Sequence, residues 1–335
     1  MKCLFLLLFA GIVVLTMLSL YGLIGDLVSP VAKAQGIESE GHQAPAQVDI
    51  PSDPFYDQQW GLVALNLPQA WLTTDGSDEV WIAVLDTGID DDHEDFLGRV
   101  VAQVNFSDSR TAGDVYGHGT HIAGIVAAAT DNGVGISGAA PGCPLMNVKV
   151  ADDEGKCDVG TVADGIRWAV DKGAKVLNIS LRFSEPSGEL EEAVEYAWNH
   201  GVVVVAAAGH GTGSAPQYPA HYNRCIAVTA VKEDGTRVPL VNYGDWVDVA
   251  APGYQIYSTL PGDEYGYKTG TSQAVAYVSG LAGLLYSIAV DTDGDGQVND
   301  EVRAAIEGSC QPLQTVGVGG GLVDAMEAVE MLNGQ

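Results

Sequence analysis

The chain has 335 residues, of which 47% are hydrophobic, and this is enough apolar material for a large buried core. It carries 15 basic and 44 acidic residues, so its formal net charge is -29 at pH 7. This charge disfavours nucleic acid and anionic membrane surfaces as partners. Cationic ions and basic substrates fit it better, although a surface charged only for solubility explains it as well.

The N-terminus has the composition of an export signal. Lys2 precedes an uncharged run from Cys3 to Gly25, and Ala32-Lys33-Ala34 forms a small-x-small cleavage pattern. The run is also long enough to span a bilayer. Residues 1–34 are therefore predicted to be a signal peptide or an N-terminal membrane anchor, and the protein is expected to be exported.

A linker and a folded domain are expected after this segment. Residues 35–52 are polar, contain proline and lack apolar periodicity, which is typical of a linker. From Asp53 to the end of the chain at 335, apolar runs alternate with helical patterns. Continuous apolar runs are typical of strands that are covered on both faces. The predicted strands are 80–85, 145–150, 174–181, 202–208 and 225–231.

A helix is predicted between two of these strands. Ser187 can cap its N-terminus and Gly201 can end it. Such a helix connects parallel strands, and its repetition predicts a doubly wound α/β domain. We therefore expect a mostly parallel sheet with helices on both faces and ligands at the carboxyl ends of the strands. The apolar positions at helical spacing are Leu190, Ala193, Val194, Ala197 and Trp198.

Four cysteines follow the export segment, at positions 143, 157, 225 and 310. An even number in an oxidising compartment permits two disulfides with three possible connectivities. Four free thiols are the alternative, and none of the spacings matches a metal site.

Three short segments offer the groups of an acyl-transfer site: VLDTG at 84–88, GHGTH at 117–121 and GTS at 270–272. A serine hydroxyl needs a base to remove its proton, and an imidazole does this when a carboxylate holds its tautomer. We expect Asp86 to orient the ring, His118 to accept the proton and Ser272 to attack. If Ser272 opens a helix to about Ile288, its backbone N–H also lies near the developing oxyanion.

Together, the motifs DTGID, GHGTHIAG and GTSQA occur in an order that resembles the subtilisin-like (subtilase) family. The resemblance extends from Asp53 to about Val329. It implies a parallel α/β fold and hydrolysis of peptide bonds in polypeptides through an acyl-enzyme. Further matching segments are DPFY at 53–56, QWG at 59–61, GAAP at 138–141, NISL at 178–181, AAAG at 206–209, AAPG at 250–253 and GLVDA at 321–325.

The chain departs from the family at the oxyanion position. The resemblance implies an asparagine in the segment Ala208-Gly209-His210-Gly211, where the asparagine side chain would donate to the oxyanion. His210 stands in its place. Its ring N–H can substitute as a donor, or the site is weakened.

The family resemblance implies that substrate binds along Ser180, Leu181 and Arg182 and at Ala208 and Gly209. The family usually has glycine where Arg182 stands, because the substrate backbone pairs closely with this edge. The arginine can crowd the groove, attract acidic substrate residues or extend into solvent. The sequence leaves these three alternatives open.

Two other departures affect the activity. Ala276 replaces a proline of the usual pattern after the nucleophile, and this raises a weaker alternative, an acyl or peptide transferase. The family's N-terminal prodomain is not recognisable in residues 35–52. The main interpretation is a monomeric serine endopeptidase, and the rival is a catalytically weakened pseudoprotease that binds polypeptides.

An EF-hand-like loop is predicted at 291–302. Carboxylates stand at its positions 1, 3 and 5 and glycine at position 6, which suits calcium. Position 12 is Val302, so the usual bidentate glutamate is missing unless Glu301 or Asp300 takes its place. The candidate ligands are Asp291, Asp293, Asp295, Gln297, Asn299 and Glu301.

A second calcium site is implied by the family resemblance. Asp53 and Asp95 match positions that bind calcium in subtilases, and carbonyl oxygens of the loop at 131–135 would complete the site. Bound cations would also offset part of the acidic self-repulsion.

Overall fold

The computed structural model describes residues 50–211 and 213–334. The predicted signal peptide or anchor at 1–34 and nearly all of the predicted linker at 35–52 lie outside the described residues. Among the residues that are described, no helix combines the length and apolar character needed to cross a membrane.

Within this described part, seven parallel strands form one sheet in the order β2-β3-β1-β4-β5-β6-β7. The five predicted strands are all present, with ends that differ by at most two residues. The strands are β1 (Ile82–Asp86), β2 (Val100–Asn105), β3 (Leu145–Lys149), β4 (Val176–Ile179), β5 (Val203–Ala207), β6 (Cys225–Val231) and β7 (Val249–Pro252).

The sequence patterns did not predict the two edge strands. β2 is half-exposed, with alternating burial, so it lacks the continuous apolar run of a central strand. β7 has four residues, of which two are alanine and one is proline, and these residue types are depleted in strands.

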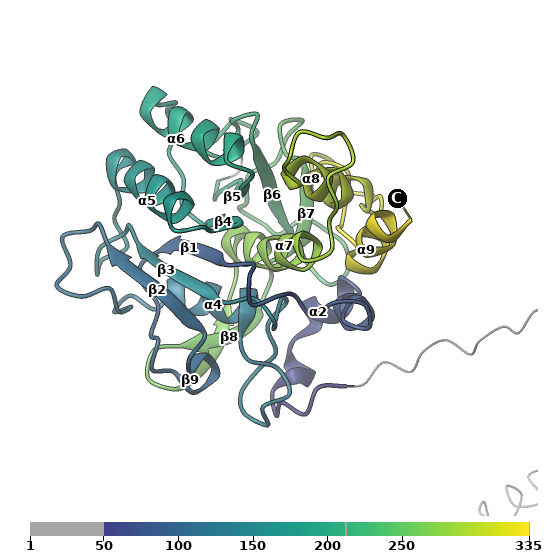
Figure 1. Cartoon of the computed structure of the whole chain (residues 1–335), viewed down its shortest axis with the longest axis horizontal. Helices are drawn as coiled ribbons and strands as arrows, with labels where there is room; N and C mark the ends of the chain where they lie inside the picture. The colour runs from purple at the N-terminus through teal and green to yellow at the C-terminus, as the bar shows by residue number, and fades with distance from the viewer. Residues whose placement is uncertain (1–49, 212, 335) are drawn as a thin grey trace, which may run out of the picture. The chain divides into compact units, whose positions relative to one another are not determined.

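Helices cover both faces of the sheet, as Figure 1 shows. One apolar cluster packs α4 (Gly119–Ala127), α7 (Thr271–Tyr286), α8 (Asn299–Gly308) and α9 (Ala325–Asn333) against one face. A second cluster packs α5 (Val159–Asp171) and α6 (Gly188–Asn199) against the other. The predicted doubly wound, parallel α/β fold is therefore confirmed.

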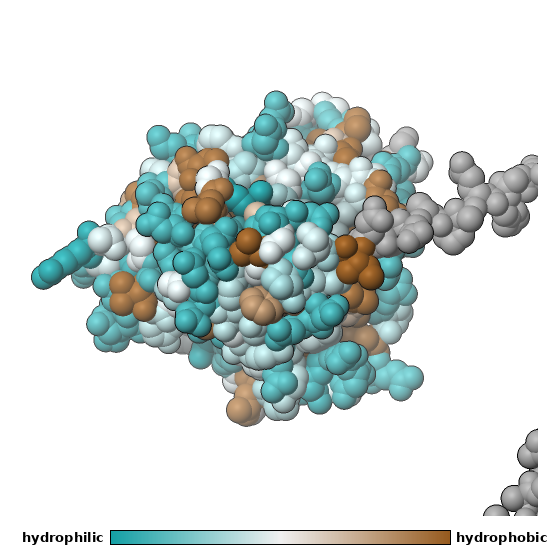
Figure 2. Space-filling model, turned by 90° about the horizontal axis from the view of Figure 1, so that it is seen from below, coloured by the Kyte–Doolittle hydropathy of each residue, from teal (hydrophilic) through white to brown (hydrophobic). Residues whose placement is uncertain are grey.

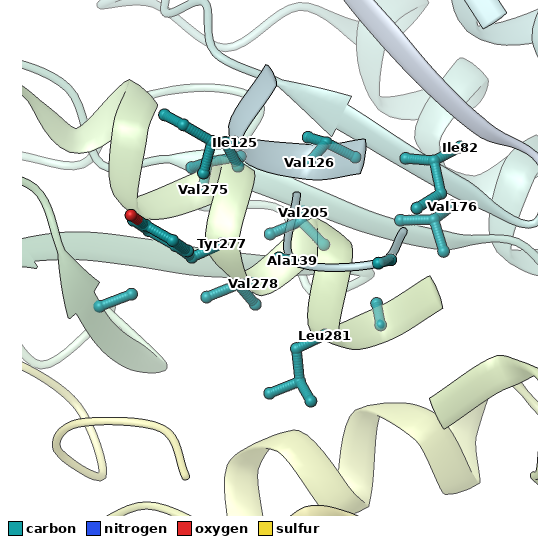
Figure 3. Close-up of a cluster of buried hydrophobic side chains, with 14 of the residues drawn as sticks. Ile82, Ile125, Val126, Ala139, Val176, Val205, Val275, Tyr277, Val278 and Leu281 are labelled. Atoms are coloured by element: carbon teal, nitrogen blue, oxygen red, sulfur yellow. The ribbon is translucent and has the colours of Figure 1, made fainter. Parts of the chain in front are cut away.

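The alternation of strand side chains explains the two clusters. Ile82 and Val84 of β1 belong to the α7 side, whereas Ala83 and Leu85 belong to the α5 side. In Figure 3, side chains of α4 and α7 gather against strand residues such as Val205. Helix α7 is buried from Thr271 to Leu285 and so forms the centre of the larger core.

Small elements complete the fold: η1 (Tyr56–Gln58), α2 (Trp60–Ala64), α3 (Leu67–Ala70), η2 (Glu94–Phe96) and the antiparallel hairpin of β8 (Ile256–Leu260) and β9 (Glu264–Lys268). The hairpin contacts the start of α4. Ser258 and Thr259 donate their hydroxyls to the carbonyl oxygens of His121 and Thr120, each at 2.8 Å. These bonds hold the helix whose N-terminus carries His118.

The four cysteines that the structure describes have free thiols, so the disulfide alternative is not observed there. Cys143 and Cys225 are buried.

On the face seen in Figure 2, hydrophilic residues dominate, and the hydrophobic ones form small separate patches. This distribution agrees with the acidic composition.

Candidate active site

The predicted catalytic residues come from the edge where the parallel strands end. Asp86 is the last residue of β1, His118 precedes α4, and Ser272 is the second residue of α7. β1 lies between β3 and β4, where the chain connections leave in opposite directions. Open α/β sheets bind ligands at such a switch point.

Asp86 and His118 form a direct hydrogen bond. Nδ1 of His118 donates to Oδ1 of Asp86 at 2.7 Å, and the backbone N–H of Thr87 donates to the same oxygen at 2.7 Å. Asp86 is fully buried. Burial by itself lowers the pKa of His118, but the charge of Asp86 and this hydrogen bond outweigh it, so the pKa is raised above 6.5. The contact therefore orients the ring and makes it a stronger base.

Ser272 lies in the same cleft with its side chain nearly buried. Its Oγ is 3.4 Å from the carbonyl oxygen of Ser180. Among the described residues, it makes no hydrogen bond with the ring of His118. Catalytic hydrogen bonds are often longer without substrate, and serine hydroxyls can occupy any of three staggered positions about the Cα–Cβ bond.

Sequence reasoning missed Asp114. This buried carboxylate accepts hydrogen bonds from the hydroxyl of Thr87, the backbone N–H of Gly117, and both the N–H and the hydroxyl of Thr120, all at 2.8 Å. Asp114 thus connects the residue after Asp86 to the loop that carries His118. The available sequence signal was an acidic residue four positions before His118.

Lys149 was missed as well. It is fully buried at the end of β3, opposite Asp86 in the sheet register. Its Nζ donates to the carbonyl oxygens of Thr87 at 2.7 Å and Gly113 at 3.0 Å, and to Asp153 at 2.8 Å. A buried ammonium group needs such partners. Lys149 therefore holds the backbone beside Asp86.

A cavity of about 280 Å³ contains the three predicted catalytic groups. Ser180, Leu181, Arg182, Gly209 and His210 also line it, so the structure brings these predicted substrate and oxyanion residues to one cleft. Ala208 is buried behind it. A larger concavity of about 690 Å³, lined by Trp60 and Tyr254 among others, includes none of these residues.

The ring of His210 lies beside the start of α7. Gly270, two residues before Ser272, could carry no Cβ without meeting this ring. Burial and the nearby charge of Arg182 lower the pKa of His210, so its ring is neutral near pH 7. A neutral imidazole still has one N–H to donate.

Arg182 bends back over the cleft wall. Its Nη1 donates to Oε1 of Gln217 at 3.0 Å, and its side chain packs on Gly209. Sequence reasoning missed Gln217, which is buried and lies 35 positions farther along the chain. Arg182 remains exposed to solvent at the edge of the cleft, but its guanidinium is held there by this bond to Gln217.

The profile of the Subtilase family matches residues 77–320. The chain belongs to the subtilase family. Thermitase from Thermoactinomyces vulgaris is 42% identical over 284 residues, which are 84% of this chain and 99% of thermitase. Subtilisin BL from Lederbergia lenta is 37% identical over 273 residues, which are 80% of this chain and 97% of that protein.

A solved structure agrees with this assignment. The structure of a protease from Pseudoalteromonas arctica matches with a TM-score of 0.77 and 30% sequence identity, covering 84% of this chain and 99% of that one. The family and these relatives identify this subtilase as a serine endopeptidase with polypeptide substrates.

An acidic loop lies between α7 and α8 of this subtilase. Asp291, Asp293 and Asp295 each place one carboxylate oxygen within 4.8 Å of the others. Glu301 faces the same loop, because its Oε1 accepts from the N–H and the hydroxyl of Thr292 at 2.6 and 2.8 Å. Its Oε2 is buried and has no partner among the described residues.

The other two predicted ligands of this loop contact α6 instead. The amide of Gln297 donates to the carbonyl oxygen of Asn199 at 3.2 Å, and the amide of Asn299 donates to that of Trp198 at 3.2 Å. These bonds attach the loop to the end of α6.

Asp53 and Asp95 both contact the loop at 131–136. Asp53 accepts the N–H groups of Asp131 and Asn132 at 3.0 and 3.1 Å. Asp95 accepts the N–H of Ile136 at 3.1 Å. Burial raises the pKa of Asp95 to about 6, so its negative charge is poorly compensated here.

Proposed function

We propose that Ser272, His118 and Asp86 are the catalytic triad of this serine endopeptidase. The hydrogen bond of 2.7 Å between His118 and Asp86, inside the cleft that contains Ser272, carries the proposal. It leaves Nε2 of the imidazole as the atom that can take the proton of Ser272. Fully buried Asp86 stabilises the imidazolium that forms.

The reaction then follows from these groups. Oγ of Ser272 attacks the scissile carbonyl carbon while His118 accepts its proton. Collapse of the tetrahedral intermediate breaks the C–N bond, and His118 returns the proton to the leaving amine. Water then attacks the acyl-enzyme, with His118 again as the base. The bond between Oγ of Ser272 and the acyl carbon breaks, His118 returns the proton to Oγ, and the new carboxylate is released.

The oxyanion would accept hydrogen bonds from two sources. The backbone N–H of Ser272 lies in the first turn of the 16-residue helix α7, where N–H groups have no partner within the helix. The neutral ring of His210, beside Gly270, would supply the second donor. Ser180, Leu181, Arg182 and Gly209, which line the cleft, would contact the substrate, whereas fully buried Ala208 would not.

We also propose a calcium ion in the loop at 291–302. Asp291, Asp293 and Asp295 would hold it. Glu301 would supply the carboxylate that an EF-hand loop usually has at position 12, where this chain has Val302. The buried, unpartnered Oε2 of Glu301 supports this ligand set, because an ion would satisfy it. Bound calcium supplies positive charge that holds the loop together.

A second calcium ion is proposed beside Asp53 and Asp95. Asp95 is fully buried, and burial raises its pKa to about 6, which supports the proposal of a cation beside it. A cation between these carboxylates and the loop at 131–136 would provide positive charge. We further propose that the protein is exported, as the N-terminal composition suggests, and N-terminal sequencing of the purified protein tests this point. We also propose that it is monomeric, which light scattering tests.

The triad is tested by comparing the full chain with its Ser272→Ala variant. We expect wild-type protein to react with a fluorophosphonate probe and to cleave casein, and the variant to do neither. Ser279→Ala is a matched control, because Ser279 is a buried serine of the same helix outside the cleft. Folded wild-type protein that neither reacts nor cleaves would reject the proposal and favour a pseudoprotease.

A further inference from the structure

Arg182 is the one lysine or arginine among the described residues that line the catalytic cleft. Its position is set by Gln217, which is only 7% exposed and whose own amide donates to the carbonyl oxygen of Pro216 at 2.9 Å. The bond of 3.0 Å from Nη1 of Arg182 to this anchored side chain directs the guanidinium along the cleft wall.

The aliphatic part of Arg182 is connected to the nucleophile through Gly209 and Thr271. Its Cδ packs on the bare backbone of Gly209, where a Cβ would collide with it. The N–H of Gly209 donates to the hydroxyl of Thr271 at 3.1 Å, and Thr271 precedes Ser272. Gly209 has a φ of +84°, a conformation that favours glycine. The close approach of Arg182 therefore depends on this residue.

The charge of Arg182 is not neutralised inside the protein. In the described part of the chain, it forms no ion pair. Gln217 accepts one hydrogen bond but carries no charge, and a guanidinium has five N–H donors. Asp86, the one carboxylate among the described lining residues, is already bonded to His118. Arg182 therefore has donors and charge available for a ligand.

The cavity places the charge of Arg182 within reach of a substrate residue that is bound at Ser272. Ser272 and Arg182 line the same cavity of about 280 Å³, which is large enough for a substrate side chain to enter beside both of them. The residue whose carbonyl carbon Ser272 attacks is held nearest to this nucleophile, so its side chain is the one best placed to enter the cavity. We propose that Arg182 determines specificity and that this endopeptidase cleaves preferentially after glutamate. The inference rests on the proposed role of Ser272.

The test uses fluorogenic peptides that are identical except for the residue before the scissile bond, which is Glu, Gln, Leu or Lys. For wild-type protein we expect kcat/KM for the Glu peptide to exceed that for the Gln peptide by about 10- to 100-fold, because charged hydrogen bonds are strong. Glu and Gln have nearly the same shape, so this ratio isolates the charge. The ratio should fall as NaCl is added.

Variants then assign the preference to one residue. In Arg182→Gln the Glu/Gln ratio should fall to about one, and Arg182→Glu should favour the Lys peptide. Arg167→Gln is the control, because Arg167 is on α5 and does not line the cleft. It should retain the wild-type ratio.

Two failures are distinguishable. Efficient cleavage by wild-type protein without preference for Glu would overturn this inference and leave the role of Ser272 intact. Failure to cleave any of the four peptides, together with no fluorophosphonate labelling, would reject the proposed triad and this inference with it.

Discussion

Thr87 donates its hydroxyl to Asp114 at 2.8 Å and accepts the backbone N–H of Gly119 with the same oxygen at 3.0 Å. Thr87 follows Asp86, and Gly119 follows His118. One hydroxyl therefore connects the two segments that carry the carboxylate and the imidazole. Asp114 holds this hydroxyl in place from inside the protein.

We expect Asp114→Ala to lower kcat/KM by about tenfold or more, because it removes four hydrogen bonds that position the loop of His118. Asp114→Asn should lower it less and should also move the acid limb of the pH profile to lower pH. The charge of Asp114 contributes to the raised pKa of His118, and asparagine lacks it. Asp92→Asn, at an exposed carboxylate, is the control. Unchanged pH profiles in both Asp114 variants would contradict this role.

The activity should depend on the protonation of His118. The base works only when its ring is neutral, and its pKa is raised above 6.5 by Asp86 despite the opposing effect of burial. Therefore kcat/KM should fall as the pH falls, with a midpoint above pH 6.5. A profile from pH 5 to 10 with an uncharged peptide substrate measures it. A midpoint below pH 6.5 would show that the charge of Asp86 does not dominate.

His210→Ala should lower kcat with little change in KM if the ring donates to the oxyanion in the transition state. Loss of one such donor costs about 100- to 1000-fold in kcat, a magnitude that comes from subtilisin itself. His210→Asn should retain most of the activity, because an amide N–H can also donate. Equal kcat values for wild type and His210→Ala would remove His210 from the mechanism.

Tyr277→Phe should stabilise the protein by about 1 kcal/mol. The hydroxyl of Tyr277 is fully buried without a partner among the described residues, and an unsatisfied buried group is costly. In Figure 3 it points away from the strand residues Ile82 and Val205. Tyr286→Phe is the matched control and should destabilise, because Tyr286 donates to the carbonyl oxygen of Gly201 at 2.9 Å. Urea unfolding in a Ser272→Ala background, which prevents self-cleavage, compares the two.

Calcium should raise the melting temperature of the Ser272→Ala protein, and EDTA should lower it. Ligand at about 100 times its Kd stabilises by about 2.7 kcal/mol, or several degrees. Asp293→Asn should remove the part of the calcium-induced rise in melting temperature that comes from the loop at 291–302. Asp53→Asn should remove the part that comes from the second site. Asp234→Asn, in another exposed acidic turn, should keep the full response. A melting temperature that EDTA leaves unchanged would argue against both sites.

Much of the fold could be predicted from the sequence, because its signals are local. The central strands are continuous apolar runs. Helix α6 (Gly188–Asn199) has Ser187 at its N-cap position, as expected, and its C-cap residue, His200, immediately precedes Gly201. The side chain of Ser187 nevertheless makes no capping bond; instead, its backbone N–H and carbonyl oxygen both form hydrogen bonds with the hydroxyl of Tyr222, each at 2.9 Å. The edge strands lacked such a pattern: β2 is only partly buried, and β7 has only four residues.

The candidate catalytic residues were also evident from the sequence, because short motifs place Asp86, His118 and Ser272 in a characteristic order. The residues that support them were not. Asp114 and Lys149 bond to Thr87, which lies 27 and 62 positions away, and only the folded chain brings them together. The tertiary structure likewise decided the direction of Arg182. The sequence left three alternatives open, and buried Gln217 and the bare backbone of Gly209 hold the arginine against the cleft wall.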